Sequence, residues 1–424
     1  MTTRTLSDWL GYIERQHPKT IAMGLERVRA VADAMALPKP ACHVITIGGT
    51  NGKGSTVAFV EAIARAAGWR VGAYTSPHLL HYNERVRIDG KDADDASLVA
   101  AFEAVEAVRG EVALTYFGYG TLAALWLFAR SDLDLAILEV GLGGRLDAVN
   151  IVDPDVAVIT TVDLDHQDWL GDTIEAIGRE KAGIARAWKP LVLGDDDPPS
   201  SVLGHAYAIG ASAVRIGCDF FFERIEGDPE HWRWREIGCE LELPMPQLAA
   251  PVQLRNAAVA IAALRALPVD MPEAAFVVGV RGAQIAARLQ RLVRDGVEIV
   301  VDVGHNPQAA RALAAWLEAS PVAGPTYAVF AALGDKDIRG VIAALEGRID
   351  RWWLAGLADA GPRGLSVDAF AERLAGTAAA KGVRCPEVAT ALTAARHVAV
   401  PGARILVLGS FHTAAAALDS LAVV

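Results

Sequence analysis

The sequence predicts an α/β protein of two domains, each built on a mainly parallel β-sheet covered by helices. The chain has 424 residues, which suits two or three domains of roughly 100–200 residues each. From about Cys42, short β-branched runs alternate with longer amphipathic stretches, the pattern of a parallel sheet with crossover helices. A glycine-rich turn also separates the first strong strand from the first strong helix, as in phosphate-binding folds.

The elements of the first half follow from this alternation. The amphipathic stretch 55–68 predicts a helix, and an alternating polar and apolar pattern over 232–243 predicts a small antiparallel side sheet. The uncharged stretch 112–129 predicts a buried helix preceded by a glycine-bearing turn, because its threonines, tyrosines and glycines do not suit a membrane span. The runs predicted as parallel strands are CHVITI (42–47), VGAYT (71–75), DLAILEV (134–140) and VAVITTV (156–162).

A second α/β unit of the Rossmann type follows a predicted helix at 254–267. The boundary is expected near Arg281 and Gly282, which gives domains 1–282 and 283–424. The predicted strands of this unit are VEIVVDV (297–303), TYAVFAAL (326–333), DRWWLAG (350–356) and RILVLGS (404–410).

The composition indicates which partners the protein is not built to bind and in which cellular compartment it is expected. Lys and Arg number 40 against 51 Asp and Glu, and the net charge of -11 disfavours a nucleic-acid or anionic-membrane surface. The four cysteines form no CxxC pair, which indicates neither a zinc cluster nor a disulfide framework and favours a reducing cytoplasm. The first twenty residues carry acids where a signal peptide has an unbroken apolar run, so secretion is not expected.

The strongest motif is GGTNGKGS, residues 48–55, between a strand and a helix. Glycines let backbone N–H groups approach phosphates, Lys53 supplies positive charge, and a hydroxyl group reaches Mg²⁺. The motif departs from GxxxxGK[ST], because Gly54 separates Lys53 from Ser55. The alternative is a glycine-rich turn without a ligand, which the strand–loop–helix context disfavours.

Polar residues also follow two further predicted strands of the first half. Glu139 ends one strand, and the loop after the next holds Asp163, Asp165, His166 and Asp168. Carboxylates at the C-terminal ends of parallel strands are where Mg²⁺ and phosphates meet, so Glu139 is a candidate metal ligand. The alternatives are an exposed strand-end acid at Glu139 and a structural histidine at His166.

Further candidate residues are a lysine on a predicted helix and several polar residues at the ends of strands in the second half of the chain. By its helical position alone, Lys181 is more simply a solvated lysine than a catalytic one. Asp302 ends a strand before a helix that starts after Asn306 and Pro307, a position suited to a ribose hydroxyl or a substrate amine. Strand-end polar residues of the same half are Asp335, Lys336, Asp337, Ser410 and His412.

Together these motifs resemble the bacterial bifunctional dihydrofolate synthase/folylpolyglutamate synthases of the Mur ligase superfamily. The resemblance rests on GTNGKGS, SPHL with NERVRIDG, LEVGLGGRLDAVNIVD, LDHQDWLG with IGREKAGI, DVGHNPQAA, GDKD and GSFHTAA, in this order over nearly the whole chain. It implies a Mur-ligase-like fold with an N-terminal P-loop ATPase domain. It also implies a ligase in which ATP phosphorylates a substrate carboxylate and the amine of L-glutamate attacks the acyl phosphate. The implied acceptors are 7,8-dihydropteroate and the γ-carboxylate of reduced folates.

The resemblance implies a role for individual residues. The residues with an implied catalytic role are Lys53, Lys181, His166 and Glu139. The resemblance implies ATP as the nucleotide, two Mg²⁺ sites and a carbamate on Lys181, and it is compatible with a bound monovalent cation. The protein is expected to be a cytoplasmic monomer. Nucleotide-binding positions are Thr50, Asn51, Gly52, Lys53, Gly54, Ser55, Asn256, Arg288, Asp302 and His305. Metal positions are Ser55, Ser76, Glu139 and His166. Substrate-binding positions are Ala22, Met23, Gly24, Thr115, Tyr116, Phe117, Gly118, Leu146, Asp147, Ala148, Ser410 and His412, all but the last two in the pterin pocket.

Two positions depart from the family pattern, and two rival functions are considered. The family has an acidic residue at Gly118, which bears on pterin recognition, and a glycine at Ala287, which bears on the hinge between domains. A nucleotide switch would explain DWLG at 168–171 as a DxxG motif, but no NKxD motif occurs. A ligase of UDP-linked cell-wall peptides uses the same chemistry, but more usually has the hydroxyl residue directly after the loop lysine.

Overall fold

The chain forms two compact units in a computed structural model that describes residues 4–17 and 22–422. Unit 1 comprises the residues up to 247 together with 254–284, and unit 2 comprises 248–253 and the residues from 285 onward. The boundary expected near Arg281 and Gly282 stays a prediction; helix α10 (Glu273–Gly282) of unit 1 ends at Gly282.

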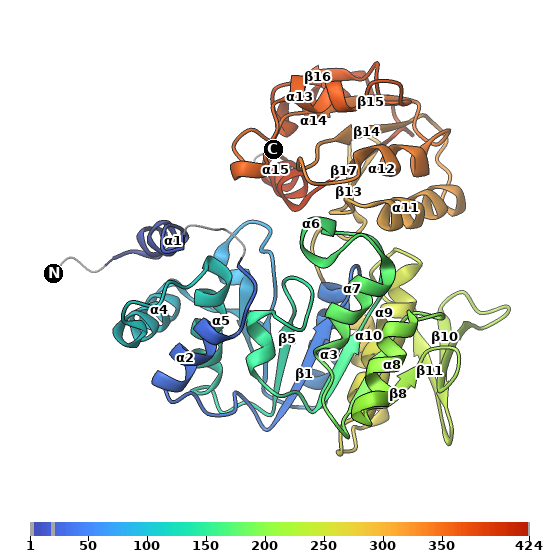
Figure 1. Cartoon of the computed structure of the whole chain (residues 1–424). Coiled ribbons are helices and arrows are strands. Elements are labelled where there is room, and N and C mark those ends of the chain that lie inside the picture. Colours follow the sequence, from blue (N-terminus) through green and yellow to red (C-terminus); the bar gives the residue numbers. More distant parts are fainter. Residues whose placement is uncertain (1–3, 18–21, 423–424) are drawn as a thin grey trace. The chain divides into compact units, whose positions relative to one another are not determined.

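Unit 1 is organised by an eight-stranded sheet of order β4-β3-β2-β5-β1-β6-β7-β8 (Figure 1). All pairings are parallel except the two antiparallel pairings of β3, with β2 and with β4. The four strands predicted in this half are confirmed as β1, β2, β5 and β6, and their side chains are almost entirely buried, as expected for a sheet covered on both faces. The strands are β1 (His43–Gly48), β2 (Val71–Tyr74), β3 (Val86–Ile88), β4 (Lys91–Asp92), β5 (Leu135–Glu139), β6 (Val156–Ile159), β7 (Pro190–Leu193) and β8 (Ser212–Arg215).

Helices cover this sheet through apolar cores. One core joins side chains of the central strands to α1, α2, α4, α5, α7 and α8, and α3 packs against β1, β2 and β5 and against α10. The further helices of this part of the chain are α1 (Leu6–Glu14), α2 (Glu26–Ala34), α3 (Lys53–Ala66), α4 (Asp95–Arg109), α5 (Tyr116–Phe128), α6 (Gln167–Leu170), α7 (Ile174–Ala182), α8 (Ser200–Ile209) and α9 (Val252–Arg265). Within the described residues, no helix is long and apolar enough to cross a membrane.

The uncharged stretch forms helix α5, but the turn predicted before it is wrong. Thr115 caps the helix by accepting a hydrogen bond from Gly118 N, so Gly118 and Gly120 lie inside the helix. A Cβ atom on Gly120 would lie 2.4 Å from the hydroxyl oxygen of Tyr82. Glycine is therefore needed here for close packing rather than for a turn.

The predicted side sheet is confirmed as three antiparallel strands, β9 (Phe220–Arg224), β10 (His231–Glu236) and β11 (Cys239–Pro244). Trp232 and Trp234 alternate with exposed or half-exposed neighbours and are fully buried. The indole Nε1 of Trp234 donates to Ala258 O in α9, which fixes this sheet to unit 1.

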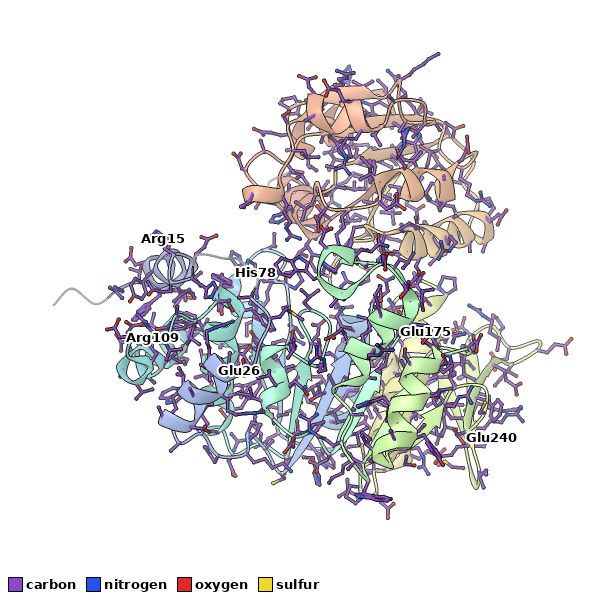
Figure 2. All side chains as sticks on the ribbon, viewed as in Figure 1. Arg15, Glu26, His78, Arg109, Glu175 and Glu240 are labelled. Atoms are coloured by element: carbon purple, nitrogen blue, oxygen red, sulfur yellow. The ribbon has the colours of Figure 1, made fainter. Side chains whose placement is uncertain are left out.

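A carboxylate hub ties the N-terminal helix to the rest of unit 1. Glu106 in α4 accepts hydrogen bonds from the hydroxyl groups of Tyr12 in α1 at 2.8 Å and Tyr119 in α5 at 2.5 Å. Arg109, on α4 next to α1 in Figure 2, donates to Glu106 and also to Tyr12 and Gln16. The hub therefore anchors α1, the helix that precedes the predicted acceptor-binding segment 22–24 in the sequence.

Unit 2 contains a six-stranded sheet of order β12-β13-β17-β14-β15-β16, parallel except for β12. The four predicted strands are confirmed as β13, β14, β15 and β17. The strands are β12 (Gln290–Arg294), β13 (Val297–Val301), β14 (Thr326–Phe330), β15 (Arg351–Ala355), β16 (Val383–Cys385) and β17 (Arg404–Leu408). The helices are α11 (Pro307–Ala319), α12 (Ile338–Leu345), α13 (Val367–Arg373), α14 (Val388–Val398) and α15 (Phe411–Ala422).

Candidate active site

The glycine-rich motif forms the loop between β1 and α3, as the sequence predicts. Lys53 is the first residue of α3, and its Nζ atom donates to Gly49 O at 3.0 Å and to Thr50 O at 3.2 Å. The lysine ammonium therefore lies over the loop at the positive end of a helix of 14 residues. This arrangement concentrates N–H donors and positive charge where phosphate oxygens bind.

Two glycines of the loop are required by their geometry. Gly49 has φ +144° and Gly52 has φ +89°. A Cβ atom on Gly49 would lie 1.9 Å from Thr160 Oγ1, and one on Gly52 would lie 2.6 Å from Asn256 Oδ1. Asn256, a buried residue of α9, therefore lies against the loop although it comes from a distant part of the sequence.

Two threonines that sequence reasoning missed hold the loop in place. Thr160 Oγ1 donates to Asn51 O at 2.6 Å, and Thr161 Oγ1 accepts from Asn51 N at 3.0 Å. Thr50 N also donates to Thr161 O at 2.7 Å. Their signal in the sequence is that they follow β6, the strand next to β1, at the same C-terminal sheet edge as the loop.

Glu139 lies at this edge too, as the last residue of β5. It is buried, so the alternative of an exposed strand-end acid is wrong. Its Oε2 atom accepts a hydrogen bond from Ser76 N at 3.0 Å, which brings two of the predicted metal positions together. Ser55, another of them, is buried in the first turn of α3.

His166 stands at the start of α6 in the loop after β6. It adopts a left-handed conformation with φ +53°, which is uncommon for a residue with a side chain. Its Nε2 atom lies 3.9 Å from Asp165 Oδ2, and both residues are half-buried. Such backbone strain is frequent where a side chain is held for function.

Lys181 of α7 is buried, so the interpretation as a solvated lysine is wrong. Burial, together with the charge of Lys53, lowers the pKa of Lys181 to about 7, although the carboxylates of Asp165 and Asp147 oppose the shift. Burial also raises the pKa of Asp147 to about 7, while donors such as Leu142 N and the charge of Lys53 oppose it. The buried Lys181 is therefore affected electrostatically by Lys53, Asp147 and Asp165, all of them residues of unit 1.

Two of the segments assigned to the acceptor, 22–24 and 146–148, contact each other in unit 1, and the third, 115–118, contacts Gly141 and Tyr74. Gly24 N donates to Leu146 O at 3.4 Å, and the ring of Phe117 packs against Gly141 and stacks with Tyr74 at 5.8 Å. Asp147, which caps Ala148–Ile151, accepts from Leu142 N and Val149 N. The other acceptor positions on these segments are Ala22, Met23, Thr115, Tyr116, Gly118 and Ala148.

Gly118 departs from the family pattern at a crowded position. A Cβ atom there would lie 3.1 Å from Val28 Cγ2 in α2. The space beside position 118 is therefore occupied by an apolar side chain of α2.

In unit 2, Arg288, Asp302 and His305 form a second polar group. Asp302 follows β13, is buried, and accepts from Leu289 N at 2.8 Å and Gly304 N at 2.7 Å. Burial raises the pKa of Asp302, with Arg288 as the main opposing charge. Arg288 lies over the ring of Phe411 at 5.2 Å, and His305 Nδ1 contacts Val303 O at 2.9 Å. Ala287, where the family has glycine, holds a left-handed φ of +55°.

The remaining strand-end residues of unit 2 differ in accessibility. The buried hydroxyl group of Ser410 accepts from Thr413 N at 3.0 Å, so it caps α15. His412 is exposed. In the GDKD loop, Lys336 is buried, whereas Asp335 pairs with Arg363 at 3.1 Å and Asp337 caps α12.

Family models place both units in one enzyme family. The Mur ligase middle domain matches residues 47–264, and the Mur ligase glutamate ligase domain matches residues 287–411. Two curated relatives named dihydrofolate synthase/folylpolyglutamate synthase align over almost the whole chain. The one from Escherichia coli is 44% identical over 98% of this chain and 95% of its own length. The one from Haemophilus influenzae is 42% identical over 97% of both.

Solved structures agree with the sequence relatives. Escherichia coli FolC in complex with DHPP and ADP has a TM-score of 0.93 at 43% identity, covering 99% of this chain and 98% of that one. A bifunctional folylpolyglutamate synthase/dihydrofolate synthase from Yersinia pestis, complexed with AMPPNP and Mn ion, has a TM-score of 0.90 at 44% identity over the same shares. A further bifunctional enzyme has Mn, AMPPNP and L-glutamate bound and a TM-score of 0.90. The chain therefore belongs to the dihydrofolate synthase/folylpolyglutamate synthases of the Mur ligase family.

Proposed function

We propose that this chain joins L-glutamate to 7,8-dihydropteroate and to the γ-carboxylate of reduced folates, using ATP. The observation that carries the proposal is the phosphate loop at the start of α3, with Lys53 over it and the buried Lys181 affected by its charge, in a chain 44% identical to an enzyme of this name. Relatives solved with ADP, AMPPNP, DHPP and L-glutamate support the nucleotide and the small-molecule substrates.

The phosphate loop would hold the nucleotide through residues 50–55. Backbone N–H groups at the start of α3 would bind the phosphate oxygens, and Lys53 would turn its ammonium from the loop carbonyls to the phosphates. Asn256, beside Gly52, would contact the nucleotide, as would Arg288, Asp302 and His305. Transfer of the terminal phosphoryl group to the acceptor carboxylate replaces a poor leaving group by phosphate, and the glutamate amine then displaces it.

The predicted metal residues suit a hard divalent cation. The buried carboxylate of Glu139 and the hydroxyl groups of Ser55 and Ser76 offer the oxygen ligands that Mg²⁺ prefers, and Glu139 already contacts the Ser76 backbone. His166 would add a nitrogen ligand. Bound Mg²⁺ supplies neutralisation of phosphate charge. Mn in related structures supports a divalent site.

Lys181 is proposed to carry a carbamate. A neutral amine attacks the carbon of CO₂ and releases a proton, and burial provides that neutral amine by lowering the pKa of Lys181 to about 7. The product replaces a cation by an anion that a nearby metal ion stabilises. A monovalent cation is proposed on the family resemblance alone.

The acceptor would lie against the segments 22–24, 115–118 and 146–148, of which the first and the last contact each other. Ser410 and His412 are proposed to contact the acceptor or glutamate. The Ser410 hydroxyl group also caps α15. We also propose a cytoplasmic monomer without nucleic-acid or membrane partners. The exposed thiols of Cys42 and Cys218 support a reducing compartment.

The test is glutamate-dependent phosphate release measured separately with dihydropteroate and tetrahydrofolate. We expect both acceptors to support release with the wild type, and neither with Lys53→Ala, which removes a preorganised charge and should lower turnover on the order of a hundredfold or more. Release with only one acceptor would limit the enzyme to one activity. Near-normal turnover of Lys53→Ala would contradict the phosphate-loop assignment.

A further inference from the structure

Arg85 is a buried cation of unit 1 that forms no ion pair with any described carboxylate. It ends the 3-10 turn Tyr82–Arg85 and is 9% exposed. Its Nε atom donates to His78 Nδ1 at 2.8 Å, and within the described residues no carboxylate lies in ion-pairing distance of its guanidinium. Two nearby arginines differ, since Arg87 pairs with Glu61 at 2.8 Å and Arg109 with Glu106 at 2.7 Å.

Aromatic rings surround the Arg85 guanidinium without neutralising it. The Cζ atom lies 5.3 Å from the ring centroid of Tyr82 and 5.5 Å from that of Tyr116. Such contacts stabilise a cation but leave its charge and its N–H donors in place. Burial raises the pKa of Tyr82 well above its ordinary value and also raises that of Tyr116, so neither phenol ionises to serve as a counter-anion near pH 7.

The position of Arg85 relates it to two parts of the proposed site. His78, labelled in Figure 2, belongs to the segment that starts with the proposed metal residue Ser76. Glu84 fixes that segment by accepting from Leu79 N, Leu80 N and His81 N at 2.6–2.7 Å. Tyr116, on the other side, belongs to a proposed acceptor segment. Arg85 therefore contacts both the segment of the metal site and the segment of the acceptor site.

We propose that the Nη groups of Arg85 bind a carboxylate of the folate acceptor. This inference rests on the proposed function, because that function supplies an anionic, aromatic acceptor. A planar guanidinium binds a carboxylate through two parallel hydrogen bonds, and the pairing is strong where water is excluded. The carboxylate has two sources: the one that is activated, present in every acceptor, and the α-carboxylate of an attached glutamate, present only in glutamylated folates.

The experiment measures dissociation constants calorimetrically for the wild type, Arg85→Met and Arg85→Lys in the full chain. The three ligands are 7,8-dihydropteroate, tetrahydrofolate and 6-hydroxymethyl-7,8-dihydropterin, which has the pterin ring but no carboxylate. We expect Arg85→Met to weaken carboxylate ligands about tenfold to a hundredfold and the pterin alcohol less than about twofold, with a smaller loss in Arg85→Lys. If Arg85→Met binds both dihydropteroate and tetrahydrofolate more weakly, Arg85 contacts the activated carboxylate. If only tetrahydrofolate binds more weakly, Arg85 contacts the α-carboxylate.

Arg70→Met is the matched control, because Arg70 is an exposed arginine of the same unit and should bind all three ligands as the wild type does. Equal weakening of all three ligands by both Arg85 variants, or no weakening of any, would overturn the inference. If Arg85→Met melts at a much lower temperature, Arg85→Lys, which keeps the charge, decides by the same comparison. Failure of the wild type to release phosphate with glutamate and an acceptor would instead count against the proposed function.

Discussion

The Oδ1 atom of Asn256 lies 2.6 Å from the point where a Cβ atom on Gly52 would stand. Gly52 precedes α3 with φ +89°, while Asn256 comes from α9, far along the chain. The phosphate loop is therefore shaped both by its own backbone and by a buried amide that closes on it. Any side chain at position 52 has to displace that amide and adopt a left-handed conformation.

We expect Gly52→Ala to weaken ATP binding by more than about tenfold, because the added methyl group displaces the loop from Asn256 and the loop N–H groups lose their alignment. Fluorescent-nucleotide titration measures this. Gly68→Ala is a matched control, since Gly68 has φ +86° and no atom within 4 Å of its would-be Cβ. It should lose about 1–2 kcal/mol of stability from left-handed strain and keep its ATP affinity. Equal ATP affinities in the two variants would show that the Asn256 contact is unimportant.

Glu139→Gln and His166→Ala should each shift the Mg²⁺ titration of activity to higher concentration, by about tenfold or more for the glutamine variant. A neutral amide is a poorer ligand for a hard cation than a carboxylate, and alanine offers no ligand. Asp168→Asn is the control in the same loop, because Asp168 is exposed. Unshifted titrations in both variants, with unchanged circular dichroism, would exclude these residues from a metal site.

Much of the fold was predictable because strands buried on both faces have a strong pattern. Runs such as CHVITI and DLAILEV are nearly continuous apolar segments, and the glycines at 49 and 52 mark a turn with positive φ. The strands β3, β4 and β8 were not predicted, since each has only two to four residues and only Val86 among them is buried, which leaves no periodic signal. The short strand β7 was not predicted either.

The site was less predictable because burial is a tertiary property. Lys181 has the sequence context of a surface helix, and only the packing of α7 shows that it is buried. Asn256 and Thr160 reach the phosphate loop from other elements, so their roles depend on strand order rather than on local motif. The turn predicted before α5 was wrong for the same reason. Gly120 is required by its close packing against Tyr82, a residue distant in sequence, and not by a turn.

Glu106→Gln should raise the KM for the folate acceptor several-fold while leaving the KM for ATP unchanged. The amide would lose charge-assisted hydrogen bonds from Tyr12, Tyr119 and Arg109, which costs about 2 kcal/mol or more and loosens α1. Steady-state kinetics with each substrate varied provides the measurement. Glu103→Gln on the same helix is exposed and should change neither constant. A rise of both KM values together would mean that the hub supports the whole unit rather than the acceptor segment.

The carbamate on Lys181 can be tested through its dependence on pH. After removal of CO₂, activity should return on adding CO₂ at a rate proportional to the neutral fraction of the amine. Because the pKa of Lys181 is lowered to about 7, that fraction rises from about a tenth at pH 6 to about nine-tenths at pH 8 and then levels off. An ordinary lysine would keep gaining through pH 10. Lys189→Ala, at an exposed lysine, should recover like the wild type.

Chemical rescue separates the carbamate from a plain ammonium that binds phosphate. Lys181→Ala should be nearly inactive under either model, so loss of activity alone decides nothing. Acetate or formate can replace a carbamate as a small anion, whereas neither can replace an ammonium, so recovery with these acids favours the carbamate. A carbamate carbon resonance from ¹³C-labelled CO₂, present in the wild type and absent in Lys181→Ala, would identify the group directly. Its absence from enzyme loaded with Mg²⁺ and an ATP analogue would rule out the carbamate and leave the ligase assignment intact, since the phosphate loop and the acceptor segments do not depend on it.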